Sequence, residues 1–515
     1  MTFVDKIDNL HSKKQVLEAG GGNERIAKQH EKGKLTARER ISKLFDQGSF
    51  IEVGTFAETS CIDFGMQNKK IAGDGVITGY GTINGRPVFI SAQDFTVIAG
   101  SLGSMHAKKI VNIMKMASKT GAPYIALNDS GGARIEEGIE ALAGYGEIFK
   151  MNAMLSGIVP QISVIMGPCA GGASYSPALA DFVFMVEKTS QMFVTGPSVV
   201  QASTGEETTM EELGGAAVHT EKSGSAHLKF ANEDLCFENI KKLLSYLPDN
   251  NMAASPVVES TDSLNRLNDE VYDLIPDKKF GYDIKTIIKS VVDGSDFFEI
   301  QPDYAKNIVI CIARINGKSV GILANQPNFK AGALDINASD KAARFVRFCD
   351  SFNIPLITLT DVPGYLPGKD QEQNGIVRHG AKLLYAFSEA TVPKINIIIG
   401  KAYGGAYIAM NSKHLGADIV YAWPSAEIAV MGPDAAANII FRNDIKESSV
   451  PVKTRNDKIN EYIEKVTNPY VAASKGYVDD IIDPAMTRQY IAAAIEMLVS
   501  KNEIRPKRKH DNMPV

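Results

Sequence analysis

The sequence contains the same pattern twice. Three segments of the first half recur 232 or 233 positions further on. The pairs are INGRPVFISAQD at 83–94 with INGKSVGILANQ at 315–326, GAPYIALNDSGG at 121–132 with NIPLITLTDVPG at 353–364, and VPQISVIMGPCAGGA at 159–173 with VPKINIIIGKAYGGA at 392–406. An internal repeat constrains architecture strongly, and 515 residues fit two domains of ordinary size. We therefore predict two diverged copies of one domain, residues 1–260 and 261–515.

Each copy has the element order of an α/β domain. A strand follows Asn-Gly, a helical stretch comes next (109–121 and 339–352), and a proline then begins a short apolar strand. A second helical stretch leads to the Val-Pro strand that ends in Gly-Gly-Ala. Strands that alternate with helices of this length are typical of βαβ units, and strands that are apolar throughout are typical of burial on both faces. The sequence therefore predicts an α/β fold that is built twice.

The Gly-Gly-Ala turns carry the candidate catalytic residues. Each turn lies where a strand passes into a helix, so free backbone N–H groups and the helix dipole favour negative charge there. Such donors stabilise an oxyanion or enolate formed from a carbonyl, and they require no covalent nucleophile. Two turns predict that two carbonyl compounds are held, one by each copy. The residues are Gly171, Gly172, Ala173, Gly404, Gly405 and Ala406.

Composition excludes several classes of protein. The formal net charge of −5 argues against a nucleic-acid partner. No apolar run reaches the ~18 residues that a spanning helix needs, and the first ten residues lack the apolar core of a signal peptide. The five cysteines are scattered and never in C-x-x-C spacing, so we expect no disulfide framework and no metal site. We expect a cytoplasmic protein.

Many long motifs resemble one known family, the acyl-CoA carboxyltransferases, over nearly the whole chain. The family includes propionyl-CoA carboxylase β subunits, the large subunit of methylmalonyl-CoA:pyruvate transcarboxylase and the α subunits of sodium-pumping methylmalonyl-CoA decarboxylases. Ile408 departs from the Asp that propionyl-CoA carboxylases usually carry, which favours the decarboxylase or transcarboxylase branch. The motifs are EAGGG (18–22), GKLTARERI (33–41), DSGGARIEEG (129–138), GPCAGGASYSPA (167–178), the segment 325–368, RHGAKLLYAFSEATVPK (378–394), KAYGGAY (401–407) and YAWPSAEIAVMG (421–432).

The resemblance implies a fold and a reaction. The fold would be two tandem crotonase-like (ClpP/crotonase) domains in a hexamer, with each active site between the first copy of one subunit and the second copy of another. By analogy, the turn at Gly171 and Gly172 would hold the thioester oxygen of a short-chain acyl-CoA, methylmalonyl-CoA or propionyl-CoA. The turn at Gly404 and Gly405 would hold the ureido oxygen of biotin, which would be attached to a partner carrier protein and not to this chain.

The resemblance also implies partners and further site residues. The partners would be a biotin carboxyl carrier protein and either a biotin carboxylase subunit or a membrane decarboxylase β subunit; the direction of the reaction stays open. Arg134 and Lys330 are candidates for contacts with the CoA phosphates. The expected substrate-binding residues are Gly131, Gly132, Arg134, Lys330, Ala331, Gly332, Tyr407 and Ile408.

Two other functions remain open from the residues alone. A crotonase-type acyl-CoA hydratase or isomerase would need a catalytic Glu beside one turn and would leave the second turn without a use. A non-catalytic scaffold that binds a biotinyl protein would not need both turns. The duplicated turn favours the carboxyltransferase over both.

Some residues have both a functional and a structural interpretation. Lys115 lies in a Met-Lys-Met like that of biotin carriers, but an amphipathic helical pattern surrounds it. Cys169 has no histidine placed to activate it, so we expect a small buried residue. His379 is expected to be structural, although a role near biotin stays open. Asp129 and Asp361 end equivalent strands, and we expect each to cap the turn that follows.

Overall fold

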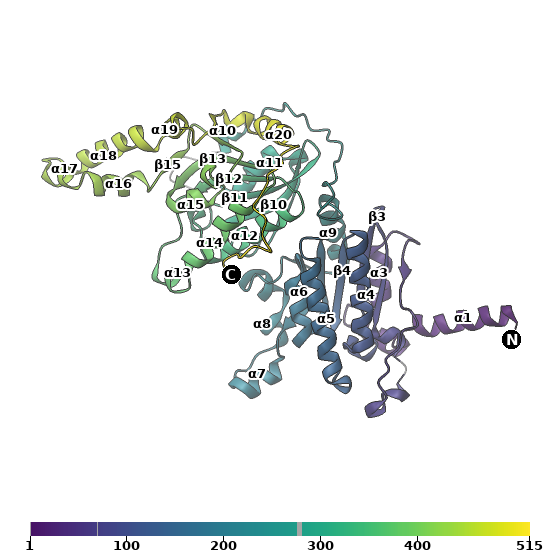
Figure 1. The fold of residues 1–515 in the computed structure, drawn as a ribbon. Coiled ribbons are helices and arrows are strands. Elements are labelled where there is room, and N and C mark those ends of the chain that lie inside the picture. Colours follow the sequence, from purple (N-terminus) through teal and green to yellow (C-terminus); the bar gives the residue numbers. More distant parts are fainter. Residues whose placement is uncertain (1, 70, 275–280) are drawn as a thin grey trace. The chain divides into compact units, whose positions relative to one another are not determined.

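The protein consists of two compact units, residues 1–253 and residues 254–515, called here the N-half and the C-half (Figure 1). The computed structural model describes residues 2–69, 71–274 and 281–515. The chain already belongs to the C-half before the expected boundary at 260, because the Val258 N–H donates to the Gly317 carbonyl (3.0 Å). The boundary therefore lies after Ala253 rather than at 260.

The N-half is built on one mixed sheet with the strand order β1-β2-β3-β4-β5-β6-β8, and β7 pairs with β5. The strands from β3 onward run parallel, whereas β1, β2 and β3 pair antiparallel. The bounds are β1 Ile51–Glu52, β2 Val76–Ile83, β3 Arg86–Gln93, β4 Tyr124–Ser130, β5 Gln161–Ala170, β6 Phe182–Val186, β7 Gln191–Phe193 and β8 Leu228–Phe230.

The C-half repeats this sheet strand for strand. Its order is β9-β10-β11-β12-β13-β14-β16, with β15 paired to β13, and the parallel part again begins at the strand after Asn-Gly. The two copies predicted from the repeat are confirmed. The bounds are β9 Phe297–Ile300, β10 Ile308–Ile315, β11 Lys318–Asn325, β12 Leu356–Val362, β13 Lys394–Tyr403, β14 Ile419–Ala422, β15 Glu427–Ala429 and β16 Asp480–Ile481.

Helices connect the parallel strands and cover the sheets (Figure 1). The N-half contains α1 Phe3–Glu18, α2 Asn23–Glu31, α3 Ala37–Leu44, α4 Ser104–Thr120, α5 Ile139–Leu155, α6 Tyr175–Leu179, α7 Pro197–Thr204, α8 Met210–Gly214 and α9 Glu233–Tyr246. The C-half contains α10 Val271–Leu274, α11 Ile284–Val291, α12 Ile336–Ser351, α13 Lys369–Gln373, α14 Ile376–Glu389, α15 Gly404–Ala409, α16 Pro433–Ile440, α17 Arg442–Glu447, α18 Pro451–Tyr462, α19 Pro469–Ser474 and α20 Thr487–Met497.

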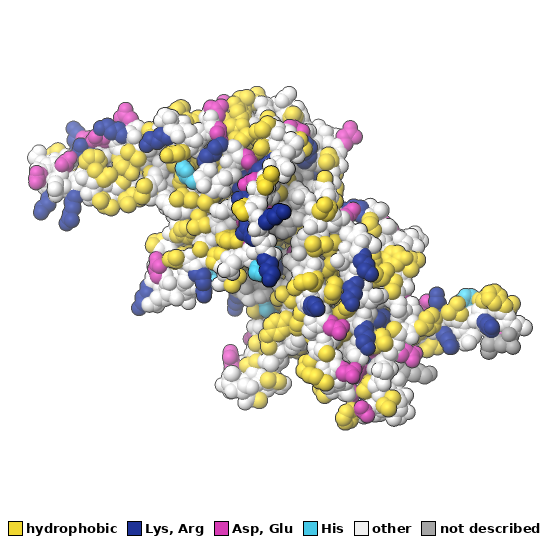
Figure 2. All heavy atoms as spheres, viewed as in Figure 1, with side chains coloured by type: hydrophobic (Ala, Val, Ile, Leu, Met, Phe, Trp, Pro, Cys, Tyr) yellow, Lys and Arg dark blue, Asp and Glu magenta, His cyan; other side chains and the backbone are white. Residues whose placement is uncertain are grey.

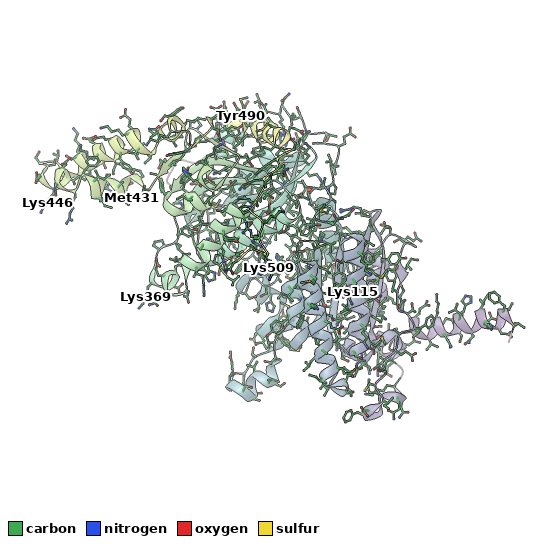
Figure 3. All side chains as sticks on the ribbon, in the orientation of Figure 1. Lys115, Lys369, Met431, Lys446, Tyr490 and Lys509 are labelled. Carbon is green, nitrogen blue, oxygen red and sulfur yellow. The ribbon has the colours of Figure 1, made fainter. Side chains whose placement is uncertain are left out.

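The helix that carries Lys115 shows how sequence pattern sets packing. Along α4 the residues Ile110, Ile113 and Met114 are buried against the sheet, as their spacing predicts. Lys115 lies on the exposed face of this long helix (Figure 3), not at the tip of a β-hairpin. The interpretation of Lys115 as an ordinary helix lysine is confirmed.

Exposed apolar side chains gather on one helical segment of the C-half. Ile439 and Ile440 at the end of α16 and Val450 and Val452 near the start of α18 are each more than half exposed (Figure 2). Across the described residues, no helix combines the length and the apolar character needed to cross a bilayer. These side chains lie on or directly beside two short helices, α16 and α18.

Candidate active site

Both Gly-Gly-Ala turns have the same backbone geometry. In the N-half β5 passes directly into a 3₁₀ turn at Gly171–Ser174, and in the C-half β13 passes directly into α15. Gly171 has φ 62° and Gly404 has φ 61°, a left-handed conformation that a side chain would strain. The glycines are therefore required by the turn itself.

The first residues of each turn keep their N–H groups outside the helical hydrogen-bond ladder. A helix offers no acceptor to its first N–H groups, so Gly171 and Gly172 in the N-half and Gly404 and Gly405 in the C-half present donors. The alanine that follows is buried in both halves, at Ala173 and Ala406, and packs the turn onto the core. Each turn therefore places the first N–H groups of a helix above an alanine packed in the core.

A strained segment precedes α4 in the N-half and α12 in the C-half. Ile98 and Ala99 have φ 46° and 50°, and Lys330 and Ala331 have φ 49° and 52°, values that cost free energy for residues other than glycine. Each segment ends in a glycine pressed against the strand next to it. A Cβ atom at Gly100 would lie 2.2 Å from the Asp129 carbonyl oxygen, and one at Gly332 would lie 2.8 Å from the Asp361 carbonyl oxygen.

The N-half member of this pair was missed by the sequence analysis. The segment 98–100 lies 232 positions before the predicted segment 330–332, so the repeat spacing already contained the signal. Only the Ala-Gly pair is shared between the two, which hid the correspondence. Strain that recurs at the same place in both copies indicates a functional constraint.

The predicted glycines of the N-half lie together. The Gly131 N–H donates to the Ala99 carbonyl (2.9 Å), and a Cβ atom at Gly132 would lie 3.1 Å from the Ala170 carbonyl oxygen. In the C-half, Tyr407 and Ile408 follow the turn on α15. Tyr407 is buried beside the His414 ring, whereas 38% of Ile408 is exposed.

Arg134 is buried and bound by partners inside the N-half. It is 1% exposed, and its guanidinium donates to Asp74 (2.6 Å) and Glu137 (2.7 Å) and to the Ser101 carbonyl (2.9 Å). The expectation that it contacts CoA phosphates is therefore wrong, because both of its terminal nitrogens are bound inside the N-half. Lys330 is half exposed and pairs with Asp335.

Cations instead line a pocket of about 490 Å³ in the N-half. The strained segment contributes Ile98 and Ala99 to its wall, together with the ring of Phe95. Among the described residues no carboxylate lines it, although Lys28 pairs with Glu24 (2.7 Å) and Lys69 with Glu136 (3.1 Å) outside the lining, so the pocket suits an anion. Its basic residues, which the sequence analysis did not single out, are Arg25, Lys28, Lys32 and Lys69.

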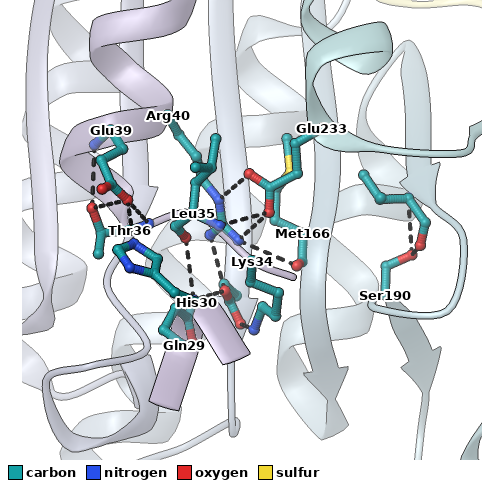
Figure 4. Close-up of polar contacts among 12 residues, drawn as sticks. Gln29, His30, Lys34, Leu35, Thr36, Glu39, Arg40, Met166, Ser190 and Glu233 are labelled. Atoms are coloured by element: carbon teal, nitrogen blue, oxygen red, sulfur yellow. Dashed lines mark hydrogen bonds and ion pairs between the residues drawn. The ribbon is translucent and has the colours of Figure 1, made fainter. Parts of the chain in front are cut away.

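Asp129 caps no turn and lies in a buried ion network, of which Figure 4 shows Lys34, Arg40 and Glu233. Its carboxylate accepts from Lys34 (2.8 Å) and Arg40 (2.9 Å), and Arg40 also donates to Glu233 (2.7 Å). All four side chains are at most 5% exposed. The expectation of a cap is wrong here, since the Ser130 hydroxyl accepts the Gly132 N–H instead (3.1 Å).

Asp361 also caps no turn, and it has different partners. Its carboxylate accepts from the Lys401 backbone N–H (2.8 Å) and from the Tyr282 hydroxyl (2.9 Å). Burial raises the pKa of Asp361, although these two donors oppose the rise. Nearby, the Tyr403 hydroxyl donates to the buried carboxylate of Glu427. The C-half thus holds one buried carboxylate, Glu427, and one partly buried carboxylate, Asp361, near the end of β13.

The remaining candidates are structural. Cys169 is fully buried, and burial raises the pKa of its thiol to about 12, so it is no thiolate nucleophile at neutral pH. His379 lies on α14 with its Nδ1 2.8 Å from the Asp340 carboxylate, as a structural histidine would. In the part of the chain that the structure describes, no three His, Cys, Asp or Glu side chains are grouped to hold a metal ion.

Comparison with known proteins identifies the family. Residues 28–513 match the model of the carboxyl transferase domain. The chain is 55% identical to a methylmalonyl-CoA decarboxylase subunit alpha from Veillonella parvula, over 100% of both chains. It is 55% identical to the mitochondrial propionyl-CoA carboxylase beta chain of Sus scrofa, over 99% of this chain and 93% of that one.

The same similarity holds in three dimensions. The crystal structure of the transcarboxylase 12S hexamer with methylmalonyl-coenzyme A bound superposes with a TM-score of 0.98 at 53% identity, over 100% of this chain and 99% of that one. The expected tandem crotonase-like fold is thereby confirmed. The chain belongs to the carboxyl transferase domain family.

Proposed function

We propose that this chain is the carboxyltransferase subunit of a biotin-dependent enzyme. It would move a carboxyl group between biotin on a carrier protein and a short-chain acyl-CoA, with methylmalonyl-CoA or propionyl-CoA as the substrate. The observation that carries the proposal is the pair of glycine turns, one in each half, with left-handed Gly171 and Gly404 at the same place. The names of the relatives agree with this chemistry.

In the N-half, the N–H groups of Gly171 and Gly172 would donate hydrogen bonds to the thioester oxygen of the acyl-CoA. Charge develops on this oxygen when the α-carbon loses its carboxyl group or its proton, so donors fixed in advance lower the barrier. Removal of one such donor costs about 100- to 1000-fold in kcat in other enzymes. No side-chain base is needed for this part of the reaction.

In the C-half, the N–H groups of Gly404 and Gly405 would hold the ureido oxygen of biotin. The fit is sterically open, since a Cβ atom at Gly405 would find its nearest neighbour, a Tyr365 ring carbon, 3.8 Å away. Biotin supplies the nitrogen that carries the carboxyl group, and it would arrive on a partner carrier protein. Tyr407 and Ile408 follow these donors on α15 and would contact the substrate beside them.

The basic pocket would hold the phosphates of CoA. Arg25 and Lys28 lie on α2 and Lys32 directly follows it; they line the pocket together with Phe95 and with Ala99 of the strained segment. Charge-assisted contacts from several cations suit a ligand with three phosphate groups. In this proposal these residues take the role first expected of Arg134.

The complete enzyme would contain further chains. We propose a hexamer of this chain, as in the transcarboxylase 12S structure, with each active site formed by the N-half of one copy and the C-half of another. A biotin carboxyl carrier protein would deliver biotin. A biotin carboxylase subunit or a membrane decarboxylase β subunit would then set the direction of the overall reaction.

A turnover assay tests the proposal. The purified chain with free biotin and methylmalonyl-CoA should consume methylmalonyl-CoA in a biotin-dependent way. Gly172→Val and Gly405→Val should each lower kcat at least about 100-fold, because the first side chain would collide with the Tyr145 ring and shift the donor, and the second would fill the open space left for biotin. Gly146→Val is the matched control, since no atom outside its own helix lies within 4 Å of a Cβ there. Absence of turnover by the wild-type chain, or full activity of either turn variant, would refute the proposal.

A further inference from the structure

An aromatic ring lies directly behind the second glycine of each turn. A Cβ atom at Gly172 would lie 3.0–3.2 Å from three carbons of the Tyr145 ring. A Cβ atom at Gly405 would lie 3.8 Å from the nearest carbon of the Tyr365 ring. The second glycine therefore packs tightly on a ring in the N-half and loosely on a ring in the C-half.

The two rings come from different elements. Tyr145 lies on α5, the helix that connects β4 to β5. The corresponding helix of the C-half, α14, carries Gly380 facing the ring, and Tyr365 enters from the loop after β12. A Cβ atom at Gly380 would lie 2.9–3.1 Å from the Tyr365 side chain, so only glycine leaves room for it. In both halves a tyrosine ring thus lies next to the second glycine of the turn. The ring comes from a helix in the N-half and from a loop in the C-half.

The Tyr145 hydroxyl does not explain why the ring is there. Tyr145 is 4% exposed, and no described residue meets its hydroxyl in hydrogen-bonding geometry. Burial raises the pKa of Tyr145. The nearby Ser130 hydroxyl opposes part of that rise. A buried hydroxyl without a partner destabilises a fold. The Tyr365 hydroxyl, in contrast, donates to the Gly380 carbonyl (3.3 Å).

We propose that Tyr145 and Tyr365 are positioning residues for the two turns. Each ring is the surface on which the second glycine rests, and it fixes the direction in which that glycine's N–H points. This inference rests on the proposed function, because it assigns the rings to the donors of that reaction. The tight contact at Gly172 makes the N-half turn the more dependent on its ring.

Substitutions at Tyr145 test the role of the ring. Tyr145→Leu should lower kcat about 10- to 100-fold while KM for methylmalonyl-CoA changes less than about twofold, because a donor displaced by about 1 Å loses that much rate. Tyr145→Phe keeps the ring and should keep kcat within about twofold. Phe149→Leu is the matched control, since this neighbouring ring on α5 stacks on Tyr145 (centroids 5.9 Å apart) and supports no turn glycine.

A double variant makes the test independent of folding effects. Gly172→Ala should lower kcat in the wild-type background, where the new methyl group meets the ring at 3.0 Å. In the Tyr145→Leu background the same change should cost much less, because the obstacle is gone. Gly405→Ala, with 3.8 Å of room, should cost little in either background.

The outcomes separate this inference from the proposed function. Loss of activity in Tyr145→Leu with retention in Tyr145→Phe and Phe149→Leu supports the positioning role. Equal kcat for Tyr145→Leu and wild type, equal losses in Tyr145→Leu and Phe149→Leu, or strictly additive effects in the double variant would overturn it. A wild-type chain without turnover refutes the proposed function instead.

Discussion

The two halves hold equivalent aspartates, the buried Asp129 and the partly buried Asp361, by different means. Asp129 and Asp361 each lie where the pairing of a central strand changes register, and each packs against the glycine that begins the approach to the turn, Gly167 or Gly400. In the C-half the next residue is Lys401, whose backbone N–H donates to Asp361. In the N-half it is Pro168, which has no N–H to donate.

The N-half compensates with charge. Lys34 and Arg40 come from the chain before the sheet and pair with Asp129 in the core. This ties α3 and the segment before it to the strand beside the turn, and α2 next to them forms the wall of the basic pocket. One difference in backbone donors thus lets an ion network couple the N-terminal helices to the site.

The largest expected effect separates the two aspartates. Asp129→Asn should lower the free energy of unfolding of the N-half by about 3–5 kcal/mol, because it leaves buried Lys34 without its counter-charge and Arg40 with Glu233 alone. Asp361→Asn is the matched variant and should cost less than about 2 kcal/mol, since it removes no ion pair. Hydrogen exchange of β4 and β12 measures each half separately. Equal losses in the two variants would contradict the comparison.

The basic pocket gives the next effect. Lys28→Ala combined with Lys32→Ala should raise KM for methylmalonyl-CoA about tenfold with kcat unchanged, because the phosphates are bound equally in ground and transition states. The same pair of changes should leave KM for free biotin unaltered. A fall in kcat, or a matching rise in KM for biotin, would show that the pocket does not serve to bind the acyl-CoA.

The pH dependence of stability distinguishes the C-half. The folded pKa of Asp361 is raised above the unfolded value of about 3.9, so the folded state binds the extra proton. The stability that the protonated Asp361 contributes to the folded state is fully present below the unfolded pKa of about 3.9. It is lost as the pH rises through the folded pKa. The stability of the wild type relative to Asp361→Asn should therefore fall as pH rises from about 4 toward neutrality.

Fluorescence can follow this effect. Trp423 is the single tryptophan of the chain, it is buried in the C-half, and its indole N–H donates to Thr487 (2.9 Å). Denaturation followed at Trp423 therefore reports on the half that contains Asp361. A difference between the two proteins that does not change with pH would show that Asp361 does not titrate in this way.

The smallest expected effect comes from Pro168→Ala, which gives the N-half the donor that the C-half has. Asp129 has a free lone pair to accept the new N–H, so stability should change by less than about 1 kcal/mol. In this background Asp129→Asn should still be strongly destabilising, because the cations remain. If Asp129→Asn were no longer destabilising in this background, the backbone donor alone would be sufficient to stabilise the site of Asp129. Hydrogen exchange of β4 measures both.

The repeat predicted the fold because both copies keep the same local signals. The Val-Pro strands and the Gly-Gly-Ala turns lie 233 positions apart and fold alike, with matching φ values at Gly171 and Gly404. Backbone geometry at such turns is set by neighbours in sequence. It could therefore be predicted without knowing any distant contact.

Long-range charge pairing could not be predicted in this way. Arg40 meets Asp129 across 89 positions and Glu233 across 193 positions, and Arg134 meets Asp74 across 60. Periodicity identifies which residues are buried but not which buried charges become partners. For this reason Arg134 resembled a loop residue able to bind phosphate, and the basic pocket on α2 was overlooked.

Subunit mixing tests the central claim most directly: a working site needs one N-half turn and one C-half turn. Gly172→Val and Gly405→Val chains, each inactive alone, are denatured together, co-assembled in equal amounts and assayed for biotin-dependent loss of methylmalonyl-CoA. Sites formed between copies should recover about a quarter of wild-type activity, the share that receives two intact turns by random assembly. Activity of either variant alone, or a co-assembled mixture that stays inactive, would contradict the account.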